Sequence, residues 1–155
     1  MKDGISAFVE DVARCAESCG EDRRGAICFV LELSEQYSYI RLRDLVRPIR
    51  FLKQINSAPP RQVGTYGFRS ELVDDDNPAR HYMAFVFVGF WLPYLLGVPV
   101  LWAWEFLGFL RYRFTWSQRD VRLGYVGLKH GRAVRRRGPN VLAPLIAKDL
   151  GDSMD

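Results

Sequence analysis

The pattern of hydrophobic and polar positions is dominated by an apolar run from Tyr82 to Trp104 that contains no charged residue. As one helix, this run is long enough to cross the roughly 30 Å hydrocarbon layer of a membrane. Pro93, Gly97 and Pro99 interrupt it and predict a turn, with two shorter helices at 79–92 and 99–112. The sequence favours burial of this hairpin in a helical core or oligomer, with membrane insertion as the alternative.

Amphipathic helices are predicted before the apolar run, in residues 1–56. Apolar residues recur every three or four positions from Ile5 to Ala16, and again from Ile27 to Tyr37. Residues 41–53 form a basic amphipathic pattern that Pro48 should kink or divide. These segments provide apolar stripes that can cover the hairpin.

Loop and capping signals define the remaining segments. Residues 57–76 lose the helical period and predict a long loop, and Asn77 with Pro78 predicts the start of the next helix. Ser117 predicts another helix start, and the glycines that follow it form a smooth strip for close helix packing: Gly124, Gly127 and Gly131.

Together these elements predict an all-α fold, a helical bundle around a buried apolar helical hairpin. The chain is expected to form a single domain over 1–155. Its parts are N-terminal amphipathic helices (1–56), a loop (57–76), the apolar hairpin (77–113) and C-terminal basic helices (117–150).

The charge is unevenly distributed, with a net charge of +4 and a sequence pI of about 9.1. Cations concentrate in 41–53 and 129–137, which permits attraction to phosphates or anionic lipid headgroups. The candidate anion-binding residues are Arg80, Lys129, Arg132, Arg135, Arg136 and Arg137.

Cys15, Cys19 and Cys28 are an odd set without CxxC spacing. Cys15 and Cys19 share a helix face, which would allow metal binding or reactivity, but small buried hydrophobes are the preferred interpretation. We therefore predict no metal and no cofactor. The N-terminus lacks the pattern of a secretory signal peptide, so a cytoplasmic or membrane-associated location is expected.

Four polar residues near the apolar run are candidates for chemistry. A turn within the run would bring Arg80 and His81 back toward Glu105, with Asp120 close by. A histidine with carboxylate partners can perform acid–base catalysis, so the tentative catalytic residues are His81, Asp120 and Glu105. The preferred alternative is that they form buried pairs that satisfy one another's charge.

Over about the middle third, the chain resembles the skeleton of VanZ-like membrane proteins. The resemblance rests on the order of Asp76, His81, Glu105, Ser117, Asp120, Gly127 and Gly131. It implies several membrane spans, whereas this chain has one apolar block and a polar N-terminal third. We therefore assign no family from it.

Three functional hypotheses follow, in order of preference. The first is a structural or interaction protein whose apolar segment packs against a partner, its own helices or lipid; a protein partner or homo-oligomer is preferred to a membrane. The second is a small enzyme or toxin-like effector that uses His81 with Asp120 or Glu105. The third is phosphate or nucleic-acid binding through the basic clusters.

Overall fold

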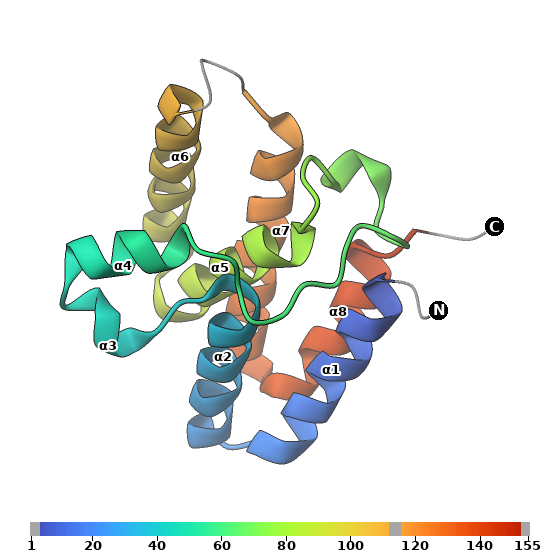
Figure 1. Cartoon of the computed structure of the whole chain (residues 1–155). Helices are drawn as coiled ribbons and strands as arrows, with labels where there is room; N and C mark the ends of the chain where they lie inside the picture. Colours follow the sequence, from blue (N-terminus) through green and yellow to red (C-terminus); the bar gives the residue numbers. More distant parts are fainter. Residues whose placement is uncertain (1–3, 112–115, 153–155) are drawn as a thin grey trace.

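The computed structural model describes residues 4–111 and 116–152, and it confirms the all-α class. The helices are α1 (Gly4–Cys19), α2 (Arg23–Ser38), α3 (Leu42–Leu45), α4 (Pro48–Ile55), α5 (Pro78–Trp91), α6 (Tyr94–Arg111), α7 (Gln118–Arg137) and α8 (Leu142–Asp149) (Figure 1). Two short 3-10 helices, η1 (Ser70–Leu72) and η2 (Pro139–Val141), complete the described elements.

The helices begin and end where local chemistry requires it. The Asp22 carboxylate accepts a hydrogen bond from the Gly25 N–H at 2.7 Å and caps α2. Pro48 divides the basic segment into α3 and α4 and occupies the first turn of α4. Ser117 caps α7 by accepting from the Asp120 N–H at 3.1 Å. The predictions made from Pro48 and Ser117 are therefore confirmed.

The core is built on close packing between α5 and α7. A Cβ atom on Gly127 would lie 2.7 Å from the Tyr82 carbonyl oxygen, and one on Gly131 would lie 2.7 Å from the Phe90 nitrogen. Gly89 of α5 is similarly placed against the Leu128 backbone. The smooth strip expected on α7 thus lets two helix backbones approach directly, while α1, α2 and α8 pack around them (Figure 1).

The apolar run is divided differently from the prediction. The break falls at Leu92 and Pro93 alone, and α6 begins at Tyr94 rather than at Pro99, which lies inside the helix. The missing N–H of Pro99 leaves the Leu95 carbonyl oxygen without its helical partner, yet the helix continues past this position. The turn expected at Pro93–Pro99 is therefore confined to its first residue.

Burial of the run is also uneven. In α5, eight residues are buried, whereas in the 18 residues of α6 only Gly97, Leu101 and Glu105 are. These three positions form one stripe, because side chains four residues apart share a helix face. The burial expected for the whole hairpin therefore holds for α5 but not along most of α6. Among the described residues, no helix is long and apolar enough to span a membrane.

The segment between α4 and α5 contains η1 as its only helical element and crosses the surface near both termini (Figure 1). Arg69 fixes it to the end of α8: its backbone N–H donates to the Leu150 carbonyl at 2.9 Å, and its side chain donates to the Gly151 carbonyl at 3.0 Å. This connection positions η1 and the acidic residues that follow it beside the beginning of α7.

Candidate functional site

His81, Glu105 and Asp120 lie together between α5, α6 and the first turn of α7. The His81 Nε2 atom is 2.8 Å from the Asp120 carbonyl oxygen and 3.5 Å from Glu105 Oε1. Because a carbonyl oxygen only accepts, Nε2 must carry the proton. Glu105 Oε1 is buried and has no hydrogen-bond partner. The structure thus brings together the three residues that the sequence selected.

Burial controls the protonation of this cluster. Loss of solvation lowers the pKa of His81 to about 4. Burial, together with the nearby charges of Asp120 and Asp74, raises the pKa of Glu105 to about 7. Burial, together with Asp74 and Asp75, raises the pKa of Asp120 to about 6. Near neutral pH, His81 is therefore uncharged, and Glu105 is the group poised to exchange a proton.

The helix termini explain how these side chains meet. Pro78 at the first position of α5 places His81 in the first turn, and the Ser117 cap places Asp120 in the first turn of α7. Asn77 occupies the cap position of α5, but its side chain makes no capping hydrogen bond, contrary to the prediction. Its Oδ1 atom is instead buried without a partner.

A depression of about 640 Å³ lies next to the cluster. Its lining consists of Ser70, Glu71, Asp74, Trp116, Ser117, Gln118, Arg119 and Arg122. His81, Glu105 and Asp120 are not part of this lining. A substrate bound in this depression would therefore not contact His81, Glu105 or Asp120, although the pKa of Glu105 is suited to acid–base chemistry.

The candidate anion-binding residues do not form one site. The Arg80 guanidinium donates to the Ile55 carbonyl oxygen at the end of α4. Lys129, Arg132, Arg135, Arg136 and Arg137 are all exposed on α7. Arg80 therefore helps to hold α4 against α5, and only the α7 cations form an exposed group.

A second buried network was not predicted from the sequence. The Tyr82 hydroxyl is 2.8 Å from His130 Nδ1, and His130 Nε2 is 2.9 Å from Asp149 Oδ2. Burial lowers the pKa of His130, although the Asp149 carboxylate opposes this effect. The network joins α5, α7 and α8 through the middle of the core, so its primary role is structural.

Tyr82→Phe is expected to lower the free energy of unfolding by about 1–2 kcal/mol, because it leaves a buried ring nitrogen of His130 without its partner. The matched control is Tyr125→Phe, since the Tyr125 hydroxyl accepts a hydrogen bond from Trp102 Nε1 at 2.9 Å in an exposed position. Urea denaturation should show a change below about 0.5 kcal/mol for the control. Equal losses in the two variants would contradict the structural role of the network.

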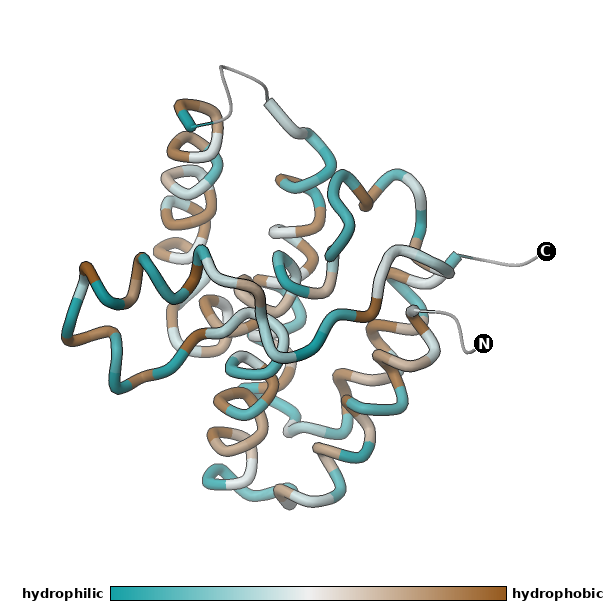
Figure 2. The backbone as a smooth tube through the Cα atoms, viewed as in Figure 1, coloured by the Kyte–Doolittle hydropathy of each residue, from teal (hydrophilic) through white to brown (hydrophobic). Residues whose placement is uncertain are grey.

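Most of the exposed large apolar side chains lie on α3, α4 and α6, which project from one side of the molecule (Figure 1). We call the surface formed by these three helices the apolar–basic face. Its exposed apolar residues are Leu42, Leu45, Val46, Ile49, Leu52, Tyr94, Leu95, Leu96, Val100, Trp102, Trp104, Phe106, Leu107 and Leu110. Figure 2 shows hydrophobic segments along all three helices.

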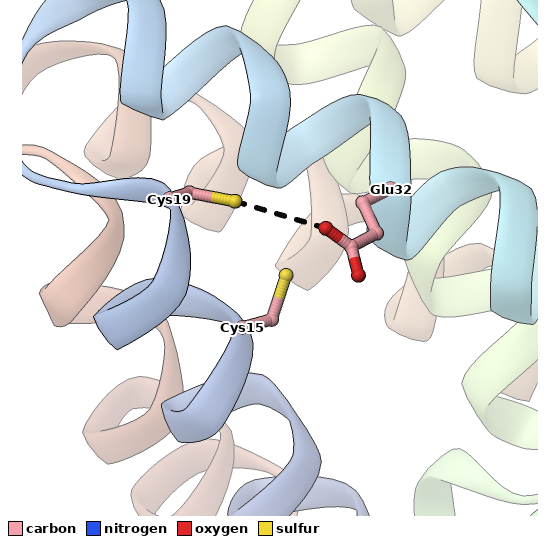
Figure 3. Close-up of side chains that lie close together, drawn as sticks. All are labelled: Cys15, Cys19 and Glu32. Atoms are coloured by element: carbon pink, nitrogen blue, oxygen red, sulfur yellow. Dashed lines mark hydrogen bonds between the residues drawn. The ribbon is translucent and has the colours of Figure 1, made fainter.

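A possible metal-ligand group lies elsewhere, between α1 and α2. Cys15, Cys19 and Glu32 each place one ligand atom within 4.8 Å of the others, and their side chains point toward one another (Figure 3). The burial predicted for Cys15 and Cys19 holds for Cys15 but is wrong for Cys19, which is only partly buried. The spacing within one helix, on which the prediction of no metal rests, does not include Glu32, because Glu32 lies on α2.

The chain matches no known protein family, no curated protein and no solved structure. It is therefore defined by its own features: an all-α bundle with a buried histidine–carboxylate cluster and an exposed apolar–basic face.

Proposed function

We propose that the protein is an interaction protein that docks its apolar–basic face on the surface of an anionic membrane. The observation that carries this proposal is the exposure of α6. A helix that is apolar around its whole circumference normally has every face covered, yet only the stripe of Gly97, Leu101 and Glu105 is buried here. Leu95, for example, is 85% exposed.

The aromatic residues of α6 support the proposal that lipid contacts the exposed surface of this helix. Trp102 and Trp104 are each more than 40% exposed, and Tyr94 is 42% exposed. Trp and Tyr combine an apolar ring with a polar hydrogen-bonding atom, so they are stabilised at the boundary between headgroups and hydrocarbon.

The charges of α3 and α4 favour an anionic surface. Arg43, Arg47, Arg50 and Lys53 are exposed beside the apolar residues of the same short helices. A shallow depression of about 380 Å³ on α4 is lined by Arg47, Pro48, Ile49, Arg50 and Lys53, which combines cations with apolar surface. Amphipathic helices of this composition bind in the plane of a membrane surface.

The expected energies are large enough to support binding. Transfer of a Leu or Ile side chain from water to an apolar phase contributes about 1.5–3 kcal/mol. Each cation near an anionic lipid surface contributes about 1 kcal/mol. A few side chains of each kind therefore suffice, even after the entropic cost of association is subtracted.

Vesicle flotation tests the proposal. The protein is expected to float with vesicles that contain phosphatidylserine and to bind at least tenfold more weakly to purely zwitterionic vesicles. The triple variant Arg47→Gln/Arg50→Gln/Lys53→Gln should lose this preference. The matched control Arg132→Gln/Arg135→Gln/Arg136→Gln removes the same charge from α7 and should retain it. Separately, Ile49→Asn/Leu95→Asn should weaken binding at least tenfold, because it removes apolar surface without changing charge.

Two results would contradict membrane docking. One is a monomer that fails to float with either vesicle, measured by light scattering and flotation on the same sample. The other is a stable dimer in which Leu95→Asn restores the monomer, because a second copy of the chain would then cover the face. If only the α7 triple variant reduced binding, the cations of α7, and not those of α3 and α4, would bind the membrane.

A further inference from the structure

Two thiols and one carboxylate converge between α1 and α2, away from the apolar–basic face, and a third thiol lies beside one of them. Cys19 Sγ lies 3.4 Å from Cys28 Sγ and 3.8 Å from Glu32 Oε2. Cys15 Sγ completes the group with Cys19 and Glu32, and all three ligand atoms lie within 4.8 Å of one another (Figure 3).

The helical hairpin explains this convergence. Cys15 and Cys19 are four residues apart on α1, and Cys28 and Glu32 are four residues apart on α2, so each pair lies on one helix face. Gly20, with a φ of 83°, and the Asp22 cap turn the chain between the helices. The turn brings the two faces together, with each helix contributing two ligand atoms.

The two separations measured from Cys19 Sγ match those of a tetrahedral metal site. In a tetrahedron with zinc–sulfur bonds of about 2.3 Å, neighbouring ligand atoms are separated by roughly 3.8 Å. The observed separations of 3.4 Å and 3.8 Å are close to that value. Cys28 Sγ lies near Cys19 but outside the group of three ligand atoms within 4.8 Å of one another, so the Cys28 side chain must turn toward Cys15 and Glu32 to complete a four-ligand site.

Hydrogen bonds already orient the carboxylate. Gln36 Nε2 donates to Glu32 Oε1 at 3.1 Å, so the other carboxylate oxygen, Oε2, faces Cys19. Outer hydrogen bonds of this kind fix the orientation of metal ligands in known sites. Glu32 is exposed and Cys15 is buried, so the group extends from the core to the surface and an ion can enter from solvent.

We propose that Cys15, Cys19, Cys28 and Glu32 bind a thiophilic divalent cation, with Zn²⁺ as the best match in geometry and ligand type. On binding, each thiol loses its proton to solvent and its sulfur forms a bond to the metal, while the carboxylate contributes one oxygen. The balance is one Zn²⁺ bound and three protons released, with no change in oxidation state.

Burial disfavours the thiolate forms of Cys15 and Cys19. Burial, with Glu32 and Cys19 nearby, raises the pKa of the Cys15 thiol, and burial with Cys28 nearby raises the pKa of the Cys19 thiol. The cation replaces the protons, and its positive charge stabilises the thiolates that burial alone disfavours.

Cobalt titration of the full-length, reduced chain tests the site. We expect one equivalent of Co²⁺ to produce a thiolate-to-cobalt charge-transfer band and Zn²⁺ to abolish it by displacement. Cys19→Ser and Cys28→Ser should each lose the band or reduce it strongly. Glu32→Gln should weaken zinc binding at least tenfold, whereas Glu17→Gln, which removes an exposed carboxylate from the same hairpin, should leave it unchanged.

Thermal unfolding provides an independent readout. At a zinc concentration about 100-fold above the dissociation constant, the melting temperature of the wild type should rise by about 5–10 °C. Cys19→Ser should show no rise, and because Cys19 is only partly buried, this variant remains informative if Cys15→Ser fails to fold.

Three results would overturn the proposal. They are the absence of a charge-transfer band in the reduced wild type, binding that persists in a Cys15→Ser/Cys19→Ser variant, and equal affinity in Glu32→Gln and Glu17→Gln. Formation of a Cys19–Cys28 disulfide in air, with no metal binding after reduction, would assign these thiols to redox chemistry instead.

Discussion

Gly131→Ala is expected to lower the free energy of unfolding by about 3 kcal/mol or more, a large part of the roughly 5–15 kcal/mol typical of a domain. A Cβ atom at this position would lie 2.7 Å from the Phe90 nitrogen and 2.9 Å from the Gly89 carbonyl carbon, and still closer to the Val86 carbonyl oxygen. All three atoms belong to the α5 backbone. No rotamer change can relieve the clash, so α5 and α7 must separate.

The matched control is Gly108→Ala on α6, where an added Cβ atom meets nothing within 4 Å. Alanine favours a helix over glycine by about 0.5–1 kcal/mol, so this variant should be neutral or slightly more stable than the wild type. Urea denaturation followed by circular dichroism measures both. Similar losses in the two variants would mean that α5 and α7 are not in direct backbone contact.

Glu105→Gln and His81→Gln are expected to change the pH dependence of stability in opposite directions. The pKa of Glu105 is raised from 4.5 to about 7 in the folded state, mainly by burial. Its stabilising contribution is therefore fully present below pH 4.5 and lost as the pH rises through about 7. Relative to the wild type, Glu105→Gln should gain stability over this range, by at most about 1.4 kcal/mol per pH unit.

The stabilising contribution of His81 changes with pH in the opposite direction. Burial lowers its pKa from 6.5 to about 4, so its contribution is present above pH 6.5 and lost as the pH falls through about 4. Relative to the wild type, His81→Gln should therefore gain stability as the pH falls through this range. Between about pH 4.5 and 6.5, Glu105 and His81 change the free energy of unfolding of the wild type in opposite directions as the pH changes. Replacing one of the two residues therefore leaves the pH dependence that the other residue causes.

Denaturation at several pH values measures these differences, with Glu17→Gln as an exposed carboxylate control whose difference from the wild type should stay constant. The free energy of unfolding of each variant, relative to the wild type, should change with pH in opposite directions for Glu105→Gln and His81→Gln. A change in the same direction would mean that the two groups are not buried as the structure places them.

Local signals in the sequence predicted much of the fold. Pro48 and Ser117 act on their own helices, so their effects could be predicted without knowing the tertiary structure. The glycine strip of α7 also indicated close packing correctly, since only a missing side chain allows such an approach. The sequence could not show that α6 is mostly exposed, because hydropathy measures the tendency to be buried and not the presence of a covering surface.

The proximity of His81 to Glu105 was predictable because it depends on one turn within the apolar run. The contact of His81 with Asp120 is made through the Asp120 backbone carbonyl and depends on how α7 packs against α5. The contact between His130 and Asp149 was not predictable, since it depends on how α8 returns to the core. The thiol group carried a signal that was overlooked: the spacing of four residues occurs in both α1 and α2, as Cys15 with Cys19 and Cys28 with Glu32. These two pairs of residues come together only because α1 packs against α2.

The narrow attachment of α6 separates the molecule into parts of unequal stability. The α5–α7 backbone contact can open only when the whole core unfolds, whereas α6 is held through Gly97, Leu101 and Glu105 and leaves the core at a proline. Its free energy of local opening therefore lies below that of the whole protein. In effect, the fold is a closely packed core of α5 and α7 that carries one mostly uncovered apolar helix.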